Sequence, residues 1–387
     1  FERTADDADI SIIEGVMGLY DGSIDSSGDG SSAHLAKVLN TPVILVVNVK
    51  GAAQSAGAVV MGFREFDKEV NLAGVILNNI ASESHYECVK TAIEESCSVA
   101  VLGYLNKDSD ITIPERHLGL IPSEEKKVSS DLYDKLGQMV IKTIDTDRLQ
   151  EIAGSPGDFP DYNKSIFINR DSLLDVTLAI ARDSAFCFYY QDDIDLFESM
   201  GAEIKLFSPL ADKSLPDGID GIYIGGGFPE LFAERLMKNE SMRSSIVEAY
   251  KQGAVIYGEC GGMMYLLEKL IDCDGRSFKM SSVHNGTSKM EKRRQGLGYV
   301  IVDVICDTVI SRKGDTFRAH EFHWSGLQDI PESTFFAYNT MKSNGKRTGV
   351  DGICEGNILA SYTHIHFSSN PALAKNMLSS MAERVQI

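Results

Sequence analysis

The alternation of short apolar runs with helix-forming stretches most restricts the fold of this chain. In the first half the apolar runs occupy 9–14, 42–48, 72–77 and 99–105, and each ends in or beside Gly, Asn or Asp. Helical stretches over 31–40, 55–66 and 85–96 separate them. This alternation predicts an α/β fold with a parallel sheet covered by helices.

The second half repeats the alternation after a break. An amphipathic helix is expected over 131–152, and the stretch that follows contains Gly154, Pro156, Gly157 and Pro160, as linkers do. Further strands are expected at 177–182, 204–207, 221–225 and 254–257, then short antiparallel strands from 298 to 367 and a helix over 371–384. We therefore expect two domains, 1–150 and 176–387, joined by a linker at 151–175.

Composition restricts the class of protein. No segment reaches the roughly 18 apolar residues of a membrane span, and residues 1–9 do not resemble a signal peptide, so we expect neither. The seven cysteines form no CxxC pair, which favours reduced thiols in a cytoplasm. A net charge of −19 with no basic stripe argues against nucleic acid as a partner.

A glycine-flanked cysteine follows the apolar run 254–257. In Gly258-Glu259-Cys260-Gly261-Gly262 the sulfur is expected on a sharp strand-to-helix turn, with the helix over 263–269. Such a turn exposes a nucleophile, and the helix N-terminus favours its reactive thiolate. A buried cysteine in a glycine-rich turn is the alternative interpretation.

Two other segments could complete a nucleophilic site. Gly225-Gly226-Gly227 follows a strand and opens a helix, so its N–H groups, with that of Gly261, are candidates for an oxyanion hole. His364 and His366 are candidate bases, and in a strand both would face the same side, so spacing does not choose between them. Either one could instead be a core histidine.

At this point a resemblance can be stated. The segments ARDSAFCFYY, GGGFPELFAERL, YGECGGMMYL, RAHEFHWS and SYTHIHFSSNP, in this order, resemble the glutamine amidotransferase domain of the cobyrinate a,c-diamide synthase family, a variant of the class I glutaminases. The resemblance implies that Cys260 attacks the glutamine amide and that a histidine, by analogy His364, transfers the proton. Many class I glutaminases orient this histidine with a following Glu, but Phe367 and Ser368 follow His366 here.

His320-Glu321-Phe322-His323 lacks the spacing of the HExxH metal motif. Strand alternation would place its two histidines on opposite faces. A packing role, or one at the edge of the substrate site, is favoured over a metal site.

The first half resembles the synthetase domain of the same family, which has a dethiobiotin-synthetase-like fold of the P-loop type. The matching segments are IIEGVMGLYDG, PVILVVNVKGAAQSAGAVVMGF, GVILNNIASESH and IPERHLGLIPS. Glu14 is a candidate Mg²⁺ ligand beside ATP phosphates, or an ordinary acid at a strand end. Asn78 is a candidate for reading the adenine edge.

Asp21, Arg116 and His117 are candidate substrate-binding residues, with a solvated charged loop as the alternative for the last two. The chain contains no GxxxxGK[ST] loop, and its first strand would end at Glu14. We therefore expect an incomplete sheet whose N-terminal portion, with the P-loop, lies upstream of this sequence.

The resemblance implies an ATP- and glutamine-dependent ligase. An ATP-derived phosphoryl group would activate a carboxylate of a tetrapyrrole polycarboxylate, and ammonia made at Cys260 would displace phosphate. The expected targets are the a and c acetate groups of cobyrinate or nickel-sirohydrochlorin, in cobalamin or coenzyme F430 biosynthesis. A cobyric acid synthase and a non-catalytic glutaminase-like regulator are the alternatives, and a homodimer is left open.

Overall fold

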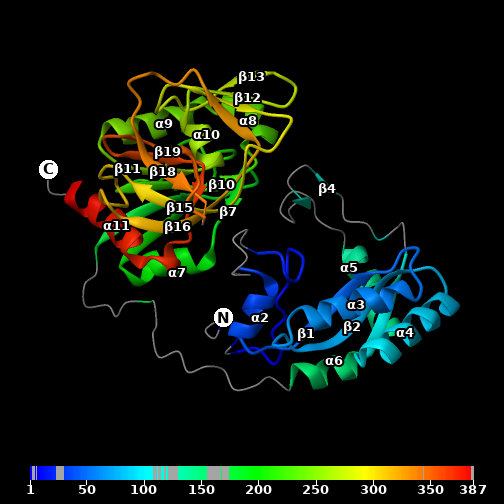
Figure 1. Cartoon of the computed structure of the whole chain (residues 1–387). Coiled ribbons are helices and arrows are strands. Elements are labelled where there is room, and N and C mark those ends of the chain that lie inside the picture. Colours follow the sequence, from blue (N-terminus) through cyan, green and yellow to red (C-terminus); the bar gives the residue numbers. More distant parts are fainter. Residues whose placement is uncertain are drawn as a thin grey trace. The chain divides into compact units, whose positions relative to one another are not determined.

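The computed structural model describes residues 1, 5, 7–22, 30–107, 111, 115–116, 119–120, 130–154, 167, 174–342 and 344–384. The chain forms two compact units, Phe1–Tyr162 and Asn163–Ile387, which are described separately below. Their helices and strands are labelled in Figure 1. No described helix combines the length and the apolar composition that a membrane crossing requires.

The first unit contains the predicted parallel sheet. Its strands β1 (Val43–Asn48), β2 (Leu72–Ile80) and β3 (Val101–Asn106) pair in parallel in that order. The helices are α2 (Ser32–Val38), α3 (Ser55–Phe66), α4 (Glu83–Cys97), α5 (Ser130–Thr143) and α6 (Thr146–Ala153). Val75 and Leu77 of β2 are fully buried with Val89 and Ile93 of α4, which forms the core of this unit. The α/β alternation is therefore confirmed for this unit.

The predicted helix over 131–152 is two helices. The side chain of Asp145 accepts a hydrogen bond from Arg148 N at 2.9 Å and caps the start of α6. Ile144, just before this cap, pairs with Gly103 in an isolated bridge instead of continuing α5. A good N-cap inside an amphipathic stretch thus starts a new helix. The end of α6 at Ala153 lies within the expected linker, and most of the rest of that linker lies outside the described residues.

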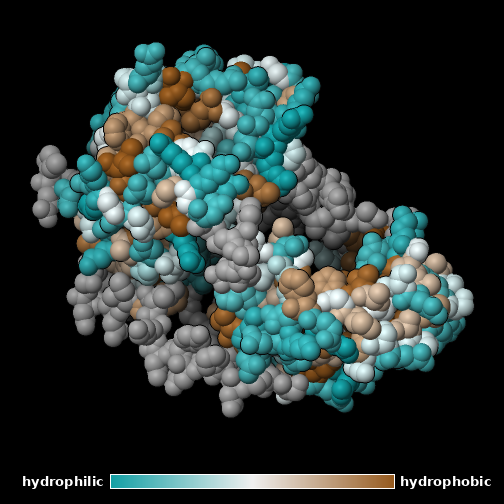
Figure 2. Space-filling view, viewed as in Figure 1, coloured by the Kyte–Doolittle hydropathy of each residue, from teal (hydrophilic) through white to brown (hydrophobic). Residues whose placement is uncertain are grey.

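The predicted strand at 9–14 is wrong. These residues form no ladder with any described strand, and Ile12 is 90% exposed. A strand is stabilised by hydrogen bonds to neighbouring strands, and an apolar sequence without such a neighbour does not form one. Ile10, Val16, Met17 and other large apolar side chains of this unit are also exposed. Hydrophobic residues interrupt the hydrophilic surface in Figure 2.

The second unit is built on a ten-stranded mixed sheet. Its strand order is β21-β16-β15-β18-β19-β20-β11-β9-β6-β8. The strands β8, β6, β9, β11 and β20 run parallel, and β19, β18, β15, β16 and β21 continue the sheet through antiparallel pairs. Their bounds are β6 Val176–Ala181, β8 Ala202–Phe207, β9 Gly221–Ile224, β11 Val255–Glu259, β15 Gly296–Val304, β16 Thr316–His323, β18 Phe336–Met341, β19 Arg347–Glu355, β20 Ile358–Ser361 and β21 Thr363–His364.

Helices and small sheets complete this unit. The helices are α7 (Gln191–Ser199), α8 (Ala233–Lys238), α9 (Glu240–Lys251), α10 (Gly261–Leu266) and α11 (Pro371–Arg384), with 3-10 turns at Pro229–Leu231 and Phe367–Ser369. A four-stranded sheet has the order β13-β12-β14-β17, from Ser277–Lys279, Lys269–Ile271, Thr287–Met290 and Ser325–Gln328. β7 (Phe186–Phe188) pairs with β10 (Gly226–Gly227), and in the first unit β4 (Glu115–Arg116) pairs with β5 (Gly119–Leu120).

Both faces of the large sheet are buried along its parallel strands β6, β9, β11 and β20. Leu178 and Ile180 of β6 belong to one apolar cluster, and the alternate residues Ala179 and Ala181 belong to another. Because neighbouring residues of a strand point to opposite faces, the two clusters lie on the two sides of the sheet. Phe367 is fully buried in the first cluster and contacts the rings of Phe197, Tyr223 and Tyr257.

We predict that Phe367→Ala lowers the free energy of unfolding of the second unit by about 3–5 kcal/mol, because it leaves a cavity among aromatic rings. Trp324 is the only tryptophan of the chain and lies in this unit, so its fluorescence during urea unfolding follows this unit. Phe335→Ala is the matched control, since Phe335 is 51% exposed, and should change stability by less than about 0.5 kcal/mol. Equal losses in the two variants would contradict the packing described.

Candidate active site

Cys260 lies in the strained turn between β11 and α10. Its φ of +50° and ψ of −100° are rare for a residue with a side chain. Cys260 N donates to Ser361 O at 2.7 Å, which ties the turn to the end of β20. A Cβ on Gly262 would lie 1.8 Å from Ile224 O, so only glycine lets α10 start this close to β9. The helix ends at Leu266, earlier than predicted, because Lys269 begins β12.

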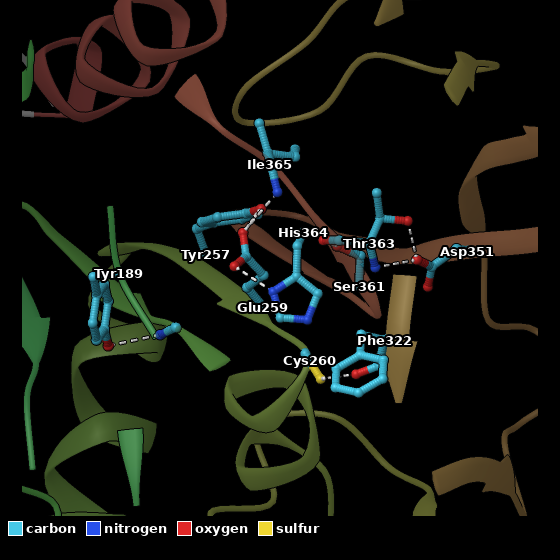
Figure 3. Close-up of polar contacts among 11 residues, drawn as sticks. Tyr189, Tyr257, Glu259, Cys260, Phe322, Asp351, Ser361, Thr363, His364 and Ile365 are labelled. Atoms are coloured by element: carbon cyan, nitrogen blue, oxygen red, sulfur yellow. Dashed lines mark hydrogen bonds and ion pairs between the residues drawn. The ribbon is translucent and has the colours of Figure 1, made fainter. Parts of the chain in front are cut away.

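His364 is brought to this turn by β21. Its Nδ1 lies 3.0 Å from Oε1 of Glu259, the last residue of β11 (Figure 3). Figure 3 shows the imidazole between the Glu259 carboxylate and the Cys260 thiol. The ring is 6% exposed, and its Nε2 makes no hydrogen bond of normal geometry with any described residue. With Nδ1 bonded to Glu259, this nitrogen is the one nearest Cys260, whose charge and hydrogen bonding act on the imidazole.

The Glu259 carboxylate is fully enclosed and fully bonded. It is 2% exposed, and its Oε2 accepts hydrogen bonds from Tyr257 Oη at 2.9 Å and Ile365 N at 3.1 Å. Together with His364, these donors satisfy both oxygens. A buried carboxylate is tolerated only with such partners.

The charges in this cluster determine the state of the imidazole. Burial alone would lower the pKa of His364, but the negative charge on Cys260 and the bonds and charge of Glu259 outweigh it and hold that pKa well above its usual range. The favoured state of His364 is therefore the imidazolium, which has a proton to give to a leaving group.

Asp351 holds the strand that carries His364. This buried carboxylate accepts from Tyr362 N at 3.1 Å, from Thr363 N at 2.8 Å and from Thr363 Oγ1 at 2.6 Å. Because β21 has only two residues, these side-chain bonds replace much of what a longer ladder would supply. The position of His364 therefore depends on Asp351 of β19.

The glycine loop lies against the same histidine. A Cβ on Gly226 would lie 2.8 Å from Cε1 of His364, and a Cβ on Gly261 would lie 3.1 Å from Gly227 N. Gly226, Gly227 and Gly261 therefore surround the turn that carries Cys260. Gly225 N donates to Tyr189 Oη at 2.8 Å, so the Gly225 N–H is engaged within the protein. The loop geometry is fixed in part by this tyrosine, which donates in turn to Ala181 O.

His366 faces a different environment. β21 ends at His364, and the side chain of His366 is 40% exposed beside Tyr190, with its Nε2 3.7 Å from Asp193 Oδ1. Burial raises the pKa of the Asp193 carboxyl, while Ser368 and His366 act against this shift. Of these two neighbouring histidine–carboxylate pairs, the one formed by His364 and Glu259 lies beside Cys260.

The histidines of β16 pack on the site without forming a metal cluster. The ring of His320 stacks on that of His364 with centroids 4.7 Å apart, and His323 stacks on Tyr362 at 3.9 Å. Burial, with the charge on His364, lowers the pKa of His320 to about 4. Within the described ranges, no three His, Cys, Asp or Glu residues are grouped to hold a metal.

The candidate residues of the first unit are less assembled. Glu14 and Asp21 are exposed and lie outside any strand. Asn78 is half-buried in β2, where its Oδ1 accepts from Asn79 N at 2.8 Å. Arg116 lies in β4, and His117 lies outside the described residues.

Glu259 is the site residue that the sequence analysis missed. In the sequence Glu259 is only one residue of the motif around Cys260, and the position after His366, where many class I glutaminases carry the orienting acid, is occupied by Phe367. Its contact with His364 joins residues 105 positions apart, which no local spacing reveals. The available signal was an acidic residue in a strand that is otherwise apolar, directly before the nucleophile.

Two family models match parts of the chain. Residues 177–372 match the CobB/CobQ-like glutamine amidotransferase domain, and residues 1–115 match an AAA domain. The solved structure of PurLQS from Thermotoga maritima is similar with a TM-score of 0.38 and 16% identity, covering 55% of this chain and 99% of that one.

Curated relatives match nearly the whole chain. A cobyrinate a,c-diamide synthase from Listeria innocua is 44% identical over 383 residues, 97% of this chain and 82% of the relative. A protein of the same name from Dehalococcoides mccartyi is 42% identical over 374 residues, 96% of this chain and 80% of the relative. Identity of this level over nearly its full length shows that the chain belongs to the cobyrinate a,c-diamide synthase family.

Proposed function

We propose that this chain amidates the a and c acetate carboxylates of a tetrapyrrole, using glutamine as nitrogen donor and ATP as energy source. Cobyrinate is the favoured substrate because the relatives carry its name. Residues 1–150 are assigned to the synthetase and 176–387 to the glutaminase. The observation that carries the proposal is the contact of Glu259 with His364 beside Cys260.

The glutaminase chemistry follows from these three side chains. The Cys260 thiolate attacks the carboxamide carbon of glutamine, and the C–N bond breaks as His364 gives its Nε2 proton to the leaving nitrogen, which departs as ammonia. The neutral imidazole then takes a proton from water, which cleaves the thioester to glutamate and restores the thiolate. N–H groups of Gly226, Gly227 and Gly261 are proposed to stabilise the oxyanion.

Glu259 is proposed as the residue that positions His364. Its bond to Nδ1 directs Nε2 toward the nucleophile, and its charge stabilises the imidazolium. The acid that class I glutaminases commonly place after the histidine is thus supplied here by the residue before the cysteine. Because Glu259 and Cys260 are consecutive residues, the chain itself keeps the Glu259 carboxylate close to the Cys260 thiol.

The residues of the first unit fit the proposed nucleotide chemistry. The exposed Glu14 carboxylate offers the hard oxygen ligand that Mg²⁺ prefers, and Mg²⁺ commonly uses one or two carboxylates together with phosphate oxygens. ATP, when bound with Mg²⁺, supplies the phosphoryl group that activates the substrate carboxylate. Asn78 is proposed for the adenine edge and Asp21, Arg116 and His117 for the substrate.

Two alternatives remain distinguishable by experiment. A cobyric acid synthase would amidate other carboxylates, and a regulatory relative would hydrolyse no glutamine. Incubation of the full-length protein with ATP, glutamine and either cobyrinate or nickel-sirohydrochlorin, followed by the mass of the product, separates these possibilities. Two added amide groups on cobyrinate support the proposal, and unchanged substrate in the presence of active glutaminase contradicts it.

We predict that Cys260→Ala in the full-length protein abolishes glutamine-dependent amidation but leaves ammonia-dependent amidation within about threefold of the unaltered full-length protein, since external ammonia bypasses the glutaminase. Product formation with glutamine and with ammonium chloride at pH 8.5 is the measurement. Cys354→Ala, which alters a half-buried thiol away from the site, is the control. Glutamine-dependent product from Cys260→Ala would show that the nucleophile is another residue.

We further predict that Glu259→Gln lowers kcat for glutamine hydrolysis by about 10²- to 10⁴-fold, as loss of the orienting acid does in related triads. Asp193→Asn is the matched control, since Asp193 is an equally buried carboxylate that faces His366 instead. It should leave kcat within about threefold. Glutamate release measures both variants, and a larger loss in Asp193→Asn would identify His366 as the base.

A further inference from the structure

One half-buried histidine next to the site has no part in the proposed chemistry. His320 of β16 lies directly opposite His364 of β21, as its partner in the antiparallel ladder. Residues opposite each other in such a ladder project their side chains from the same face, with Cβ atoms about 4.5–5.5 Å apart. The two imidazoles stack here, with centroids 4.7 Å apart and 15° between their planes. The His320 ring therefore covers one face of the His364 ring.

Two other contacts of His364 are made at the edge of its ring. Its Nδ1 lies 3.0 Å from Glu259 Oε1, and a Cβ on Gly226 would lie 2.8 Å from its Cε1. A hydrogen bond at one edge restrains the tilt of the ring only weakly, because hydrogen-bond angles have a broad distribution. A flat ring packed on the face opposes the tilt directly, because tilting separates the two rings or makes their atoms collide. His320 thus restrains the plane of the His364 ring.

The charge on His320 decides whether this stack is favourable. Burial, followed by the charge on His364, lowers the pKa of His320 to about 4, with His366 acting in the same direction and Glu259 against it. His320 is therefore neutral near pH 7, while the pKa of His364 is held well above its usual range. The face of a neutral aromatic ring attracts a cation, whereas a second cation at this distance would repel it. The stack thus favours the charged form of His364.

We infer that His320 is a positioning residue of the glutaminase, which holds the plane of the His364 ring and stabilises its protonated form. The inference rests on the proposed glutaminase function and extends it to the first histidine of the segment His320-Glu321-Phe322-His323. His320 acts through His364 and takes no part in proton transfer or in the binding of glutamine. A neutral aromatic ring without nitrogen atoms would serve equally well at this position.

The test compares His320→Leu with His320→Phe in the full-length protein. Leucine fills much of the same space but has no ring, whereas phenylalanine keeps a flat, neutral ring. His320→Leu should lower kcat for glutamine hydrolysis by about 5- to 30-fold, which corresponds to the loss of one desolvated cation–ring contact, and should leave KM within about threefold. His320→Phe should keep kcat within about twofold of the unaltered protein. Release of glutamate measures both variants.

Phe317→Leu is the control for loss of a ring from β16. Phe317 is buried on the same strand, but its ring contacts that of Tyr338, with centroids 5.7 Å apart. This variant should keep kcat within about twofold. Trp324 fluorescence during urea unfolding verifies that each variant is folded when kcat is measured. If His320→Leu does not fold, His320→Phe still tests the inference, because a large loss of kcat in that variant would contradict it.

The pH profile of kcat/KM separates this role from simple filling of space. In the proposed mechanism His364 donates its proton, so activity is lost as pH rises through the pKa of His364 in the free enzyme. Removal of the ring face takes away part of what raises that pKa, so His320→Leu should move the alkaline limb down by about 0.5–1 pH unit. His320→Phe should leave the limb in place. Glu259, Cys260 and His366, whose charges also act on these two imidazoles, are the same in both variants.

Equal values of kcat and of the alkaline limb in the two His320 variants, whether both are retained or both are reduced, would overturn the inference, because the ring face would then contribute nothing. Absence of glutaminase activity in the unaltered full-length protein would instead reject the proposed function.

Discussion

The buried carboxylate of Glu259 is the interaction on which the rest of the site depends. A charge enclosed this completely is tolerated because His364, Tyr257 and the Ile365 amide all bond to it. Two of these partners belong to the segment after β20, far along the chain from β11. The attraction between Glu259 and these partners therefore holds β21 and Ile365 against the turn that carries Cys260. Packing alone would not specify which way the imidazole faces.

Local sequence patterns predicted most of the strands and helices near the site. The apolar run before Cys260 became β11, α3 has the predicted bounds Ser55–Phe66, and α11 has the predicted bounds Pro371–Arg384. These elements depend on periodicity within a few turns, which a single sequence displays. The candidate strand at 9–14 failed because a strand also requires a neighbour, and apolar character does not report whether one is present.

The sequence was enough to name Cys260 and the two histidines as candidates, but it did not predict which side chains contact one another. Spacing left His364 and His366 equivalent, since alternate residues of a strand share a face. The structure separates them because β21 stops at His364, and the Asp351 bonds to Tyr362 and Thr363 hold this short strand in place. Glu259 was missed for a related reason: it acts on a residue 105 positions away. Such contacts are set by the order of strands in the sheet, which no local motif encodes.

The order of these elements along the chain has a consequence for biosynthesis. Glu259 and Cys260 leave the ribosome together, but their imidazole partner lies more than 100 residues later, on a strand that pairs with β16. Proteins emerge from the N-terminal side and fold as units become complete. With the roles proposed above, a nascent chain that already contains the Cys260 thiol lacks its proposed proton donor until residue 364 has been made and β21 has joined the sheet. We therefore expect glutamine hydrolysis only once the sheet is nearly whole.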